Sequence, residues 1–180
     1  MPSQPALRTD TTRPASIVAA PGEPRARHRR LAIATVVALA ILLVDLATKA
    51  IMTRSLEWAE QRWLIDGWVG LELTRNRGIA FGLGDGSWVI TLLVIGGFIT
   101  LIWFILRSDI ADHAIGAVAF GLAVGGAIGN LVDRISDGAV TDFFVLGPWP
   151  RFNVADSALT LGLVALAIIE IRVHGGYHGA

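Results

Sequence analysis

The sequence predicts an all-α membrane protein with four transmembrane helices, and on the outer face a small extramembrane β-hairpin or sheet with an interfacial segment. Hydrophobic residues make up 53% of the 180 residues and charged residues 17%, and the mean hydropathy is +0.59. Long apolar runs recur along the chain, and a helix of about 20 residues crosses about 30 Å of hydrocarbon. Only helices and closed barrels satisfy their backbone there, and unbroken runs favour helices.

Composition also excludes several kinds of protein. The net charge of zero gives no general attraction to nucleic acid, and we expect none as a partner. The absence of cysteine excludes thiolate chemistry, disulfides and cysteine-based metal sites. His174 and His178 share a four-residue spacing, but they lie in a glycine-rich tail. We interpret them as part of a solvated tail rather than a metal site, and expect neither a metal nor a cofactor.

The chain before the first apolar run predicts a disordered cytoplasmic tail over residues 1–30, rich in arginine and proline. Six arginines precede the first span, so the positive-inside rule places the N-terminus in the cytoplasm. A secretory signal over 31–44 is the alternative. Apolar character resumes past Asp45, however, and no A-x-A-like cleavage site follows promptly.

The membrane domain is expected over residues 31–172, followed by a C-terminal tail at 173–180. Its four spans are predicted at about 31–53, 88–106, 113–132 and 154–171. An even number of passes puts both termini in the cytoplasm. The third span carries a stripe of small residues that lets another helix approach closely: Gly121, Gly125 and Gly129.

The segment 54–87 joins the first two spans and is too long for a simple turn. Its tryptophans suit a membrane interface: Trp58, Trp63 and Trp68. Residues 69–74 and 79–83 then alternate large apolar with small or polar side chains around the turn-like 76–78. This pattern predicts a hairpin or small sheet on the outer surface.

With this topology, the polar side chains that are costly to bury all map to the outer membrane face. They are Asp45, Lys49, Asn130, Asp133, Arg134, Asp142, Asn153 and Asp156. A carboxylate at mid-bilayer costs roughly 2.5 to 3.5 kcal/mol on insertion scales. Several together therefore indicate a polar cavity or a functional site.

Some of these residues also have local explanations. Asp45 and Lys49 are four residues apart with the acid first, and could form only an intrahelical ion pair. Asn153, followed three residues later by Asp156, resembles a helix cap with its capping-box acid. Neither pattern by itself indicates a catalytic role.

The end of the third span has a similar alternative. Asn130, Asp133 and Arg134 share one helix face, where contacts between Asp133 and Arg134 could simply cap the helix end. Asp137 and Gly138 then predict a turn, and we assign Asp137 no role.

The remaining chemistry favours the carboxylates. The sequence has no G-x-S-x-G elbow and no phosphate-binding glycine loop. Two close aspartates share a proton, so that one takes a proton from water while the other donates to an amide carbonyl. Such a pair hydrolyses peptide bonds without a cofactor. A small transporter or proton-conducting protein, and a non-catalytic membrane scaffold, are the alternatives.

Four ordered blocks of the sequence resemble the lipoprotein signal peptidases, or signal peptidase II. They are VDLATK at 44–49, NRGIAFG at 76–82, GGAIGNLVDRISDGAVTDF at 125–143 and FNVADSALTLG at 152–162. The resemblance implies a membrane aspartyl endopeptidase that removes the signal peptide from diacylglyceryl-modified prolipoproteins, cutting just before the lipidated cysteine. It also implies a bacterial cell membrane, a site near the outer leaflet, contact with membrane lipid and inhibition by globomycin. We expect the protein to act as a monomer.

The resemblance implies that Asp142 and Asp156 are the catalytic aspartates. It assigns supporting positions to Asn130 and Arg134, which would hold the substrate backbone, and to Asn153 beside the pair. Further matched positions would shape the site: Asp45, Lys49, Asn76 and Gly78. Asp133 also matches, and we expect it to orient Arg134 rather than to react.

Overall fold

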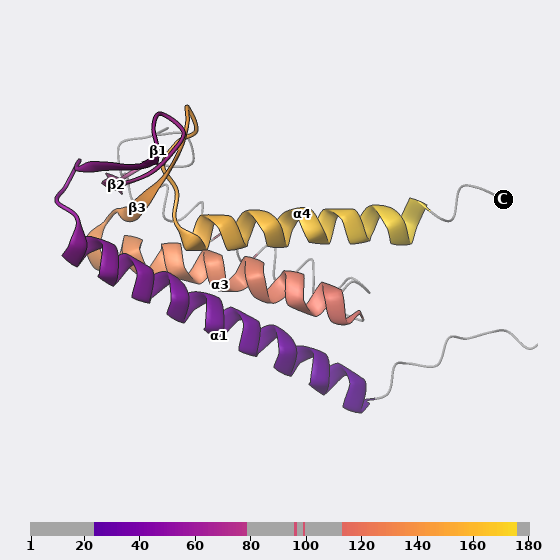
Figure 1. The fold of residues 1–180 in the computed structure, drawn as a ribbon. Coiled ribbons are helices and arrows are strands. Elements are labelled where there is room, and N and C mark those ends of the chain that lie inside the picture. The colour runs from indigo at the N-terminus through magenta and orange to yellow at the C-terminus, as the bar shows by residue number, and fades with distance from the viewer. Residues whose placement is uncertain (1–23, 79–95, 97–98, 100–112, 176–180) are drawn as a thin grey trace, which may run out of the picture.

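The computed structural model describes residues 24–78, 96, 99 and 113–175. Within these residues, three long helices lie side by side and a three-stranded sheet lies at one end of them (Figure 1). The helices are α1 (Pro24–Ser55), α3 (Ala114–Asp137) and α4 (Val154–Gly175). The strands are β1 (Gln61–Ile65), β2 (Val69–Asn76) and β3 (Val140–Leu146).

The three helices are long and apolar enough to cross a membrane, over Ala26–Ser55, Ala114–Asp137 and Val154–Arg172. They carry exposed aliphatic side chains of the kind that face lipid, including Leu43, Ile115 and Ile171. Three of the four predicted spans are therefore confirmed as helices. The predicted span 88–106 lies outside the described residues except for Gly96 and Ile99, both of which are helical.

The first helix is longer than expected. It begins at Pro24, seven residues before the predicted span, because proline is favoured at the start of a helix and the following residues are good helix formers. The rest of the predicted tail lies outside the described residues.

The glycines of α3 explain how closely the helices pack. A Cβ atom added at Gly121 or Gly125 would lie 2.6 Å from a backbone oxygen of α1. One added at Gly126 would collide with the backbone oxygen of Ala155 on α4. The predicted stripe thus packs closely against α1, and Gly126, which is not part of that stripe, makes the close contact with α4.

The sheet is antiparallel with the order β1-β2-β3. Strand β2 was predicted by its alternating pattern, but the predicted partner at 79–83 lies outside the described residues. The strands paired with β2 were not predicted. In particular, β3 lies between the predicted spans 113–132 and 154–171, where the sequence predicts no strand, because β3 is buried along most of its length and shows no alternation.

A left-handed glycine connects the bundle to the sheet. Helix α3 ends at Asp137, and Gly138 has φ 67°, with its N–H donating to Arg134 O at 3.2 Å. The predicted turn at these residues is confirmed. It leads directly into β3, which pairs with β2 so that Asp142 lies opposite Thr74.

The sheet lies across the end of the bundle where α1 and α3 end and α4 begins (Figure 1). Several apolar side chains remain exposed on it and on its turns: Trp58, Trp63, Leu64, Ile65, Trp68, Leu146 and Trp149. Indole rings favour the boundary between hydrocarbon and water. This distribution suits a sheet that rests at a membrane interface.

Candidate active site

Two aspartates lie where the sheet meets the helices. Asp142 is in the middle of β3 and has 1% of its surface exposed, and Asp156 is in the first turn of α4. Asn153, which immediately precedes α4, is fully buried. The C-terminal part of α3 contributes Asn130 to the same region.

Both oxygens of Asp142 accept hydrogen bonds from asparagine amides. Asn76 Nδ2 on β2 donates to Oδ2 at 3.0 Å, and Asn153 Nδ2 donates to Oδ1 at 2.8 Å. The predicted substrate-site position Asn76 is therefore brought to the carboxyl by the pairing of β2 with β3. Donated hydrogen bonds favour the ionised form of a carboxyl.

Asp156 has a matching environment. Asn130 Nδ2 donates to its Oδ1 at 2.7 Å, and the backbone N–H of Asn153 donates to its Oδ2 at 3.2 Å. In return, Asn153 Oδ1 accepts the backbone N–H of Asp156 at 2.8 Å. This is the capping box that the sequence suggested. Asn153 and Asp156 therefore cap the helix and also belong to the site.

A chain of two amides joins the carboxyls. Asn153 Nδ2, which donates to Asp142, also lies 3.1 Å from Asn130 Oδ1, and Asn130 in turn donates to Asp156. The four side chains come from β3, α3 and the start of α4. The site therefore exists only when the sheet and both helices are assembled.

Burial gives Asp142 an unusual acidity. Loss of water around the carboxyl, together with the negative charge of Asp156, raises the pKa of Asp142 from 3.8 to about 7. The hydrogen bonds from Asn76 and Asn153 and the charge of Lys49 act in the opposite direction and are weaker. Near neutral pH, Asp142 can therefore hold or release a proton, as an acid–base group must.

A buried ion triad adjoins Asn130, whose Oδ1 lies 3.4 Å from Lys49 Nζ. Lys49 Nζ is 2.7 Å from Asp45 Oδ2 and 2.9 Å from Asp133 Oδ2, and all three residues are buried. The predicted intrahelical pair between Asp45 and Lys49 is confirmed. Asp45 also accepts the backbone N–H of Ala155, and Asp133 that of Thr141, each at 2.9 Å. The triad thus fastens α1 to α4 and α3 to β3.

Arg134 is connected to the site through Gly78 and Asn76. Its Nη2 donates to Gly78 O at 2.7 Å, and Gly78 N–H donates to Asn76 Oδ1 at 2.9 Å. We expected Asp133 to orient Arg134, but its ion pair is with Lys49. The reason is that adjacent residues on a helix point about 100° apart, so the two side chains enter different neighbourhoods. Among the described residues, Arg134 Nη1 is buried with no hydrogen-bond partner.

Sequence reasoning missed one contact that supports the site. Arg151, two residues before Asn153, donates from Nε and Nη2 to Glu72 Oε2 on β2 at 3.0 and 2.5 Å. This pair fastens the chain between β3 and α4 to the sheet. The residues are far apart in sequence, so only the unpredicted pairing of the strands could have indicated the contact.

No cluster of three or more histidine, cysteine, aspartate or glutamate side chains suitable for a metal occurs in residues 24–78, 96, 99 and 113–175. His174 and His178 have side chains outside the described part of the structure. The carboxylates of Asp45 and Asp133 share the Lys49 ammonium.

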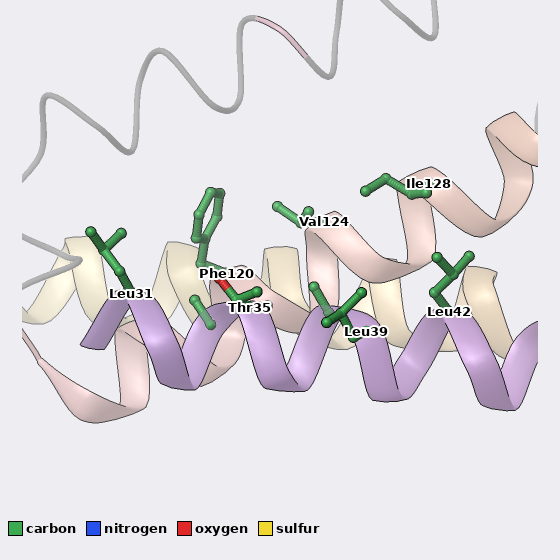
Figure 2. A pocket seen from close by; sticks show the side chains of 10 residues that line it. Leu31, Thr35, Leu39, Leu42, Phe120, Val124 and Ile128 are labelled. Atoms are coloured by element: carbon green, nitrogen blue, oxygen red, sulfur yellow. The ribbon is translucent and has the colours of Figure 1, made fainter. Parts of the chain in front are cut away.

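A separate cavity of about 240 Å³ lies between α1 and α3. Figure 2 shows Leu31, Leu39 and Leu42 of α1 facing Phe120, Val124 and Ile128 of α3 across it. The described residues that line it include no ionisable side chain, and Thr35 contributes their only side-chain hydroxyl. These residues offer no group for acid–base chemistry and no activated nucleophile.

A family model described as signal peptidase (SPase) II matches residues 37–172. This chain belongs to the signal peptidase II family. The matched range includes every residue of the two-aspartate site and of the ion triad. As a member of the signal peptidase II family, the chain is a peptidase and a membrane protein.

Individual relatives agree with the family match. A lipoprotein signal peptidase of Rhodococcus jostii (strain RHA1) is 38% identical over 161 residues, covering 84% of this chain and 78% of the relative. One of Shouchella clausii (strain KSM-K16) is 37% identical over 147 residues, covering 79% and 94%. A solved bacterial membrane enzyme has a TM-score of 0.73 and 26% identity, covering 82% of this chain and 92% of that one.

Proposed function

We propose that this member of the signal peptidase II family is an aspartyl endopeptidase that removes the signal peptide from diacylglyceryl-modified prolipoproteins. The bond cleaved would lie just before the lipidated cysteine. One observation carries the aspartyl mechanism: the buried carboxyl of Asp142 and the half-buried carboxyl of Asp156 are joined through the amides of Asn153 and Asn130. The relatives named as lipoprotein signal peptidases support the substrate class.

In the proposed reaction the pair holds one proton between its two carboxyls. Asp142, whose pKa is raised to about 7, carries it and donates it to the carbonyl oxygen of the scissile amide. Asp156 takes a proton from a water whose oxygen bonds to the carbonyl carbon. As the carbon–nitrogen bond breaks, the proton on Asp156 passes to the leaving amine, and the gem-diol proton returns to Asp142. Because the two carboxyls titrate as a unit, these roles apply to the state in which Asp142 carries the shared proton and Asp156 is ionised.

We propose that the chain crosses the membrane four times, with 88–106 as the second span. The apolar run there has the same length as the helical span Val154–Arg172, 19 residues, and Gly96 and Ile99 within it are helical. The arginine-rich start of α1 supports a cytoplasmic N-terminus. An even number of spans would then put both termini in the cytoplasm.

The same arrangement would put the site near the outer leaflet. The aspartates lie at the end of the bundle opposite the start of α1, beside the sheet with its exposed tryptophans (Figure 1). A site at this depth could reach a scissile bond near the headgroups while the substrate's acyl chains stay in the bilayer. We propose that the protein works as a monomer in contact with lipid, and that globomycin inhibits it.

The direct test is cleavage by the purified protein. In detergent or lipid vesicles, it should cut a synthetic precursor peptide that carries a diacylglyceryl cysteine, with the new N-terminus at that cysteine by mass spectrometry. Globomycin should block the reaction. No product from the lipidated peptide would contradict the proposed function, and product formed at an undiminished rate with globomycin would contradict the proposed inhibitor class.

A further inference from the structure

The two carboxyls depend on the orientation of three asparagine side chains. Asn76, Asn130 and Asn153 each direct Nδ2 at a carboxyl oxygen. An amide can rotate by 180°, which exchanges its oxygen and its nitrogen. A rotated amide would place an oxygen against the carboxylate, replacing a hydrogen bond with repulsion. Something on the far side of each amide must therefore fix its orientation.

Backbone groups fix two of the three. Asn76 Oδ1 accepts the N–H of Gly78 at 2.9 Å, and Asn153 Oδ1 accepts the N–H of Asp156 at 2.8 Å. A backbone N–H can only donate, so the atom facing it must be the oxygen. The nitrogen then necessarily points to the carboxyl. No side-chain substitution elsewhere can remove these constraints.

Asn130 differs, because side chains alone face its oxygen among the described contacts. Asn153 Nδ2 lies 3.1 Å from Asn130 Oδ1, but the same nitrogen is 3.3 Å from Thr141 O. Asn153 therefore keeps an acceptor if the amide of Asn130 rotates. The other neighbour is Lys49 Nζ, 3.4 Å from Asn130 Oδ1.

The lysine has no such alternative. Its ammonium has three hydrogens and no lone pair. Its described acceptors are three: Asp45 Oδ2, Asp133 Oδ2 and Asn130 Oδ1. Lys49 is only 5% exposed, so water cannot readily replace an acceptor that is lost. Rotation of Asn130 would turn an NH₂ group toward a buried cation.

We propose that Lys49 is a positioning residue, which fixes the amide of Asn130 so that its NH₂ group faces Asp156. This inference rests on the proposed function and extends it, since the family resemblance gives Lys49 only a general part in shaping the site. A competing explanation is that Lys49 simply neutralises Asp45 and Asp133. The two explanations differ in what happens when all three charges are removed together.

The test uses the variant Asp45→Asn/Lys49→Met/Asp133→Asn in the full-length protein. Both asparagines can still accept the backbone N–H groups of Ala155 and Thr141, so the contacts between elements are kept. If Lys49 orients Asn130, kcat for the lipidated peptide falls about tenfold or more, as expected for losing a hydrogen bond to a charged group. KM should stay within about threefold.

The pH profile separates orientation from charge. Within the triad, the charge of Lys49 lowers the pKa of Asp142, so removing the triad's charges by itself moves the alkaline limb of kcat upward. An amide oxygen facing Asp156 adds a further upward move of about one pH unit, and this second part disappears in an Asn130→Ala background, which has no amide to rotate. The other charged groups at the site, Arg134 and Asp142, are unchanged. A triple variant with kcat within about twofold of the parent, or an upward move of the limb that is as large in the Asn130→Ala background as in the parent, overturns the proposal.

A double-mutant cycle gives a second measurement that does not depend on the triple variant being as stable as the parent. In an Asn130→Ala background there is no amide to orient, so neutralising the triad should reduce kcat no further. A full additional loss would show that Lys49 acts by another route. Lys49→Arg, which also presents donors only, should keep kcat within about threefold and leave the alkaline limb in place. Loss of either contradicts the proposal.

Failure of the proposed function would be recognised separately. If the unsubstituted protein does not cleave the peptide, the aspartyl peptidase proposal fails. The positioning role can then still be tested by the pH dependence of thermal unfolding. Neutralising the triad should move its pH-dependent decrease to higher pH by more in the parent than in the Asn130→Ala background, and an equal move in the two backgrounds overturns the inference.

Discussion

The side-chain amide of Asn153 makes two contacts at the site. Its nitrogen donates to Asp142 Oδ1 at 2.8 Å, and its oxygen accepts the backbone N–H of Asp156 at the start of α4. One residue therefore starts a helix and holds a buried carboxyl. Stability and activity can be separated at this position, because they use different atoms of the side chain.

Replacing Asn153 by serine and by alanine should separate the two roles. Serine is also a good helix cap, so Asn153→Ser should keep most of the stability, whereas Asn153→Ala should lose about 1 kcal/mol more. Both should lose at least about tenfold in kcat, because alanine has no donor and the serine hydroxyl, which is shorter and used at the cap, replaces only the oxygen of Asn153. Thermal unfolding and peptide cleavage measure the two effects. Serine activity close to that of the parent would contradict the role of the Asn153 nitrogen.

Asp142→Asn and Asp156→Asn should each give an inserted, folded protein that cleaves the lipidated peptide at least about 100-fold more slowly, since the pair loses one acid–base group. The matched control is Asp137→Asn. Asp137 lies at the end of α3 and is exposed, with a distant ion pair to Arg75, and its variant should cleave at the parental rate. Full activity of either site variant would remove that aspartate from the mechanism.

The pKa of Asp142 predicts how stability varies with pH. Its folded-state pKa of about 7 lies above the ordinary 3.8, so the folded protein binds more protons than the unfolded chain between these values. Stability should therefore fall as pH rises from about 4 to 7 and level off above, by roughly 4 kcal/mol at most for this group.

Asp142→Asn removes this titration. Between pH 4 and 7 the unfolding midpoint of the parent should therefore fall relative to that of Asp142→Asn. Above pH 7 the difference between the two midpoints should stay constant. Asp137→Asn provides the matched comparison. A difference for Asp142→Asn that is independent of pH over this range would contradict the raised pKa.

Gly126→Ala tests the close approach of α3 and α4. The added methyl would meet the backbone oxygen of Ala155, which cannot move without shifting the first turn of α4. We expect a loss of about 1 to 3 kcal/mol in stability and slower cleavage, because Asp156 is in that turn. Gly96→Ala is the matched control, since no atom of residues 24–78 or 113–175 lies within 4 Å of a Cβ there. Equal stability of the two variants would contradict the packing argument.

The natural chain has no cysteine, so single cysteines can report its orientation. Asp66→Cys, in the exposed turn between β1 and β2, should react with a membrane-impermeant maleimide added outside intact cells. Arg29→Cys, exposed near the start of α1, should react only after the membrane is permeabilised. The reverse pattern would invert the proposed topology.

Much of this architecture is predictable from hydropathy and periodicity. The last two described spans begin within one residue of their predicted starts, and β2 follows its alternation. The start of α1 was not predicted correctly because the helix extends N-terminally beyond the apolar run, into residues 24–30. Strand β3 was missed because a strand buried along its length has no period of two.

The candidate site was predictable at the level of which residues meet. Topology alone put Asn130, Asp142, Asn153 and Asp156 at one end of the bundle, where their contacts now lie. Which partner each side chain takes was not predictable. The assignment of Asp133 to Lys49 rather than Arg134 depends on helix rotation and depth, which spacing in one sequence does not encode.

The contact of Gly126 with Ala155 joins two helices backbone to backbone, with no flexible side chain between them to absorb sliding. Membranes differ in thickness, and a bundle accommodates a mismatch by tilting or by deforming the surrounding lipid. Here α4 cannot easily slip along α3, so the bundle must respond as a rigid unit. The spacing of the two carboxyls should thus be the same in short-chain and long-chain lipids, even where the inclination of the whole molecule differs.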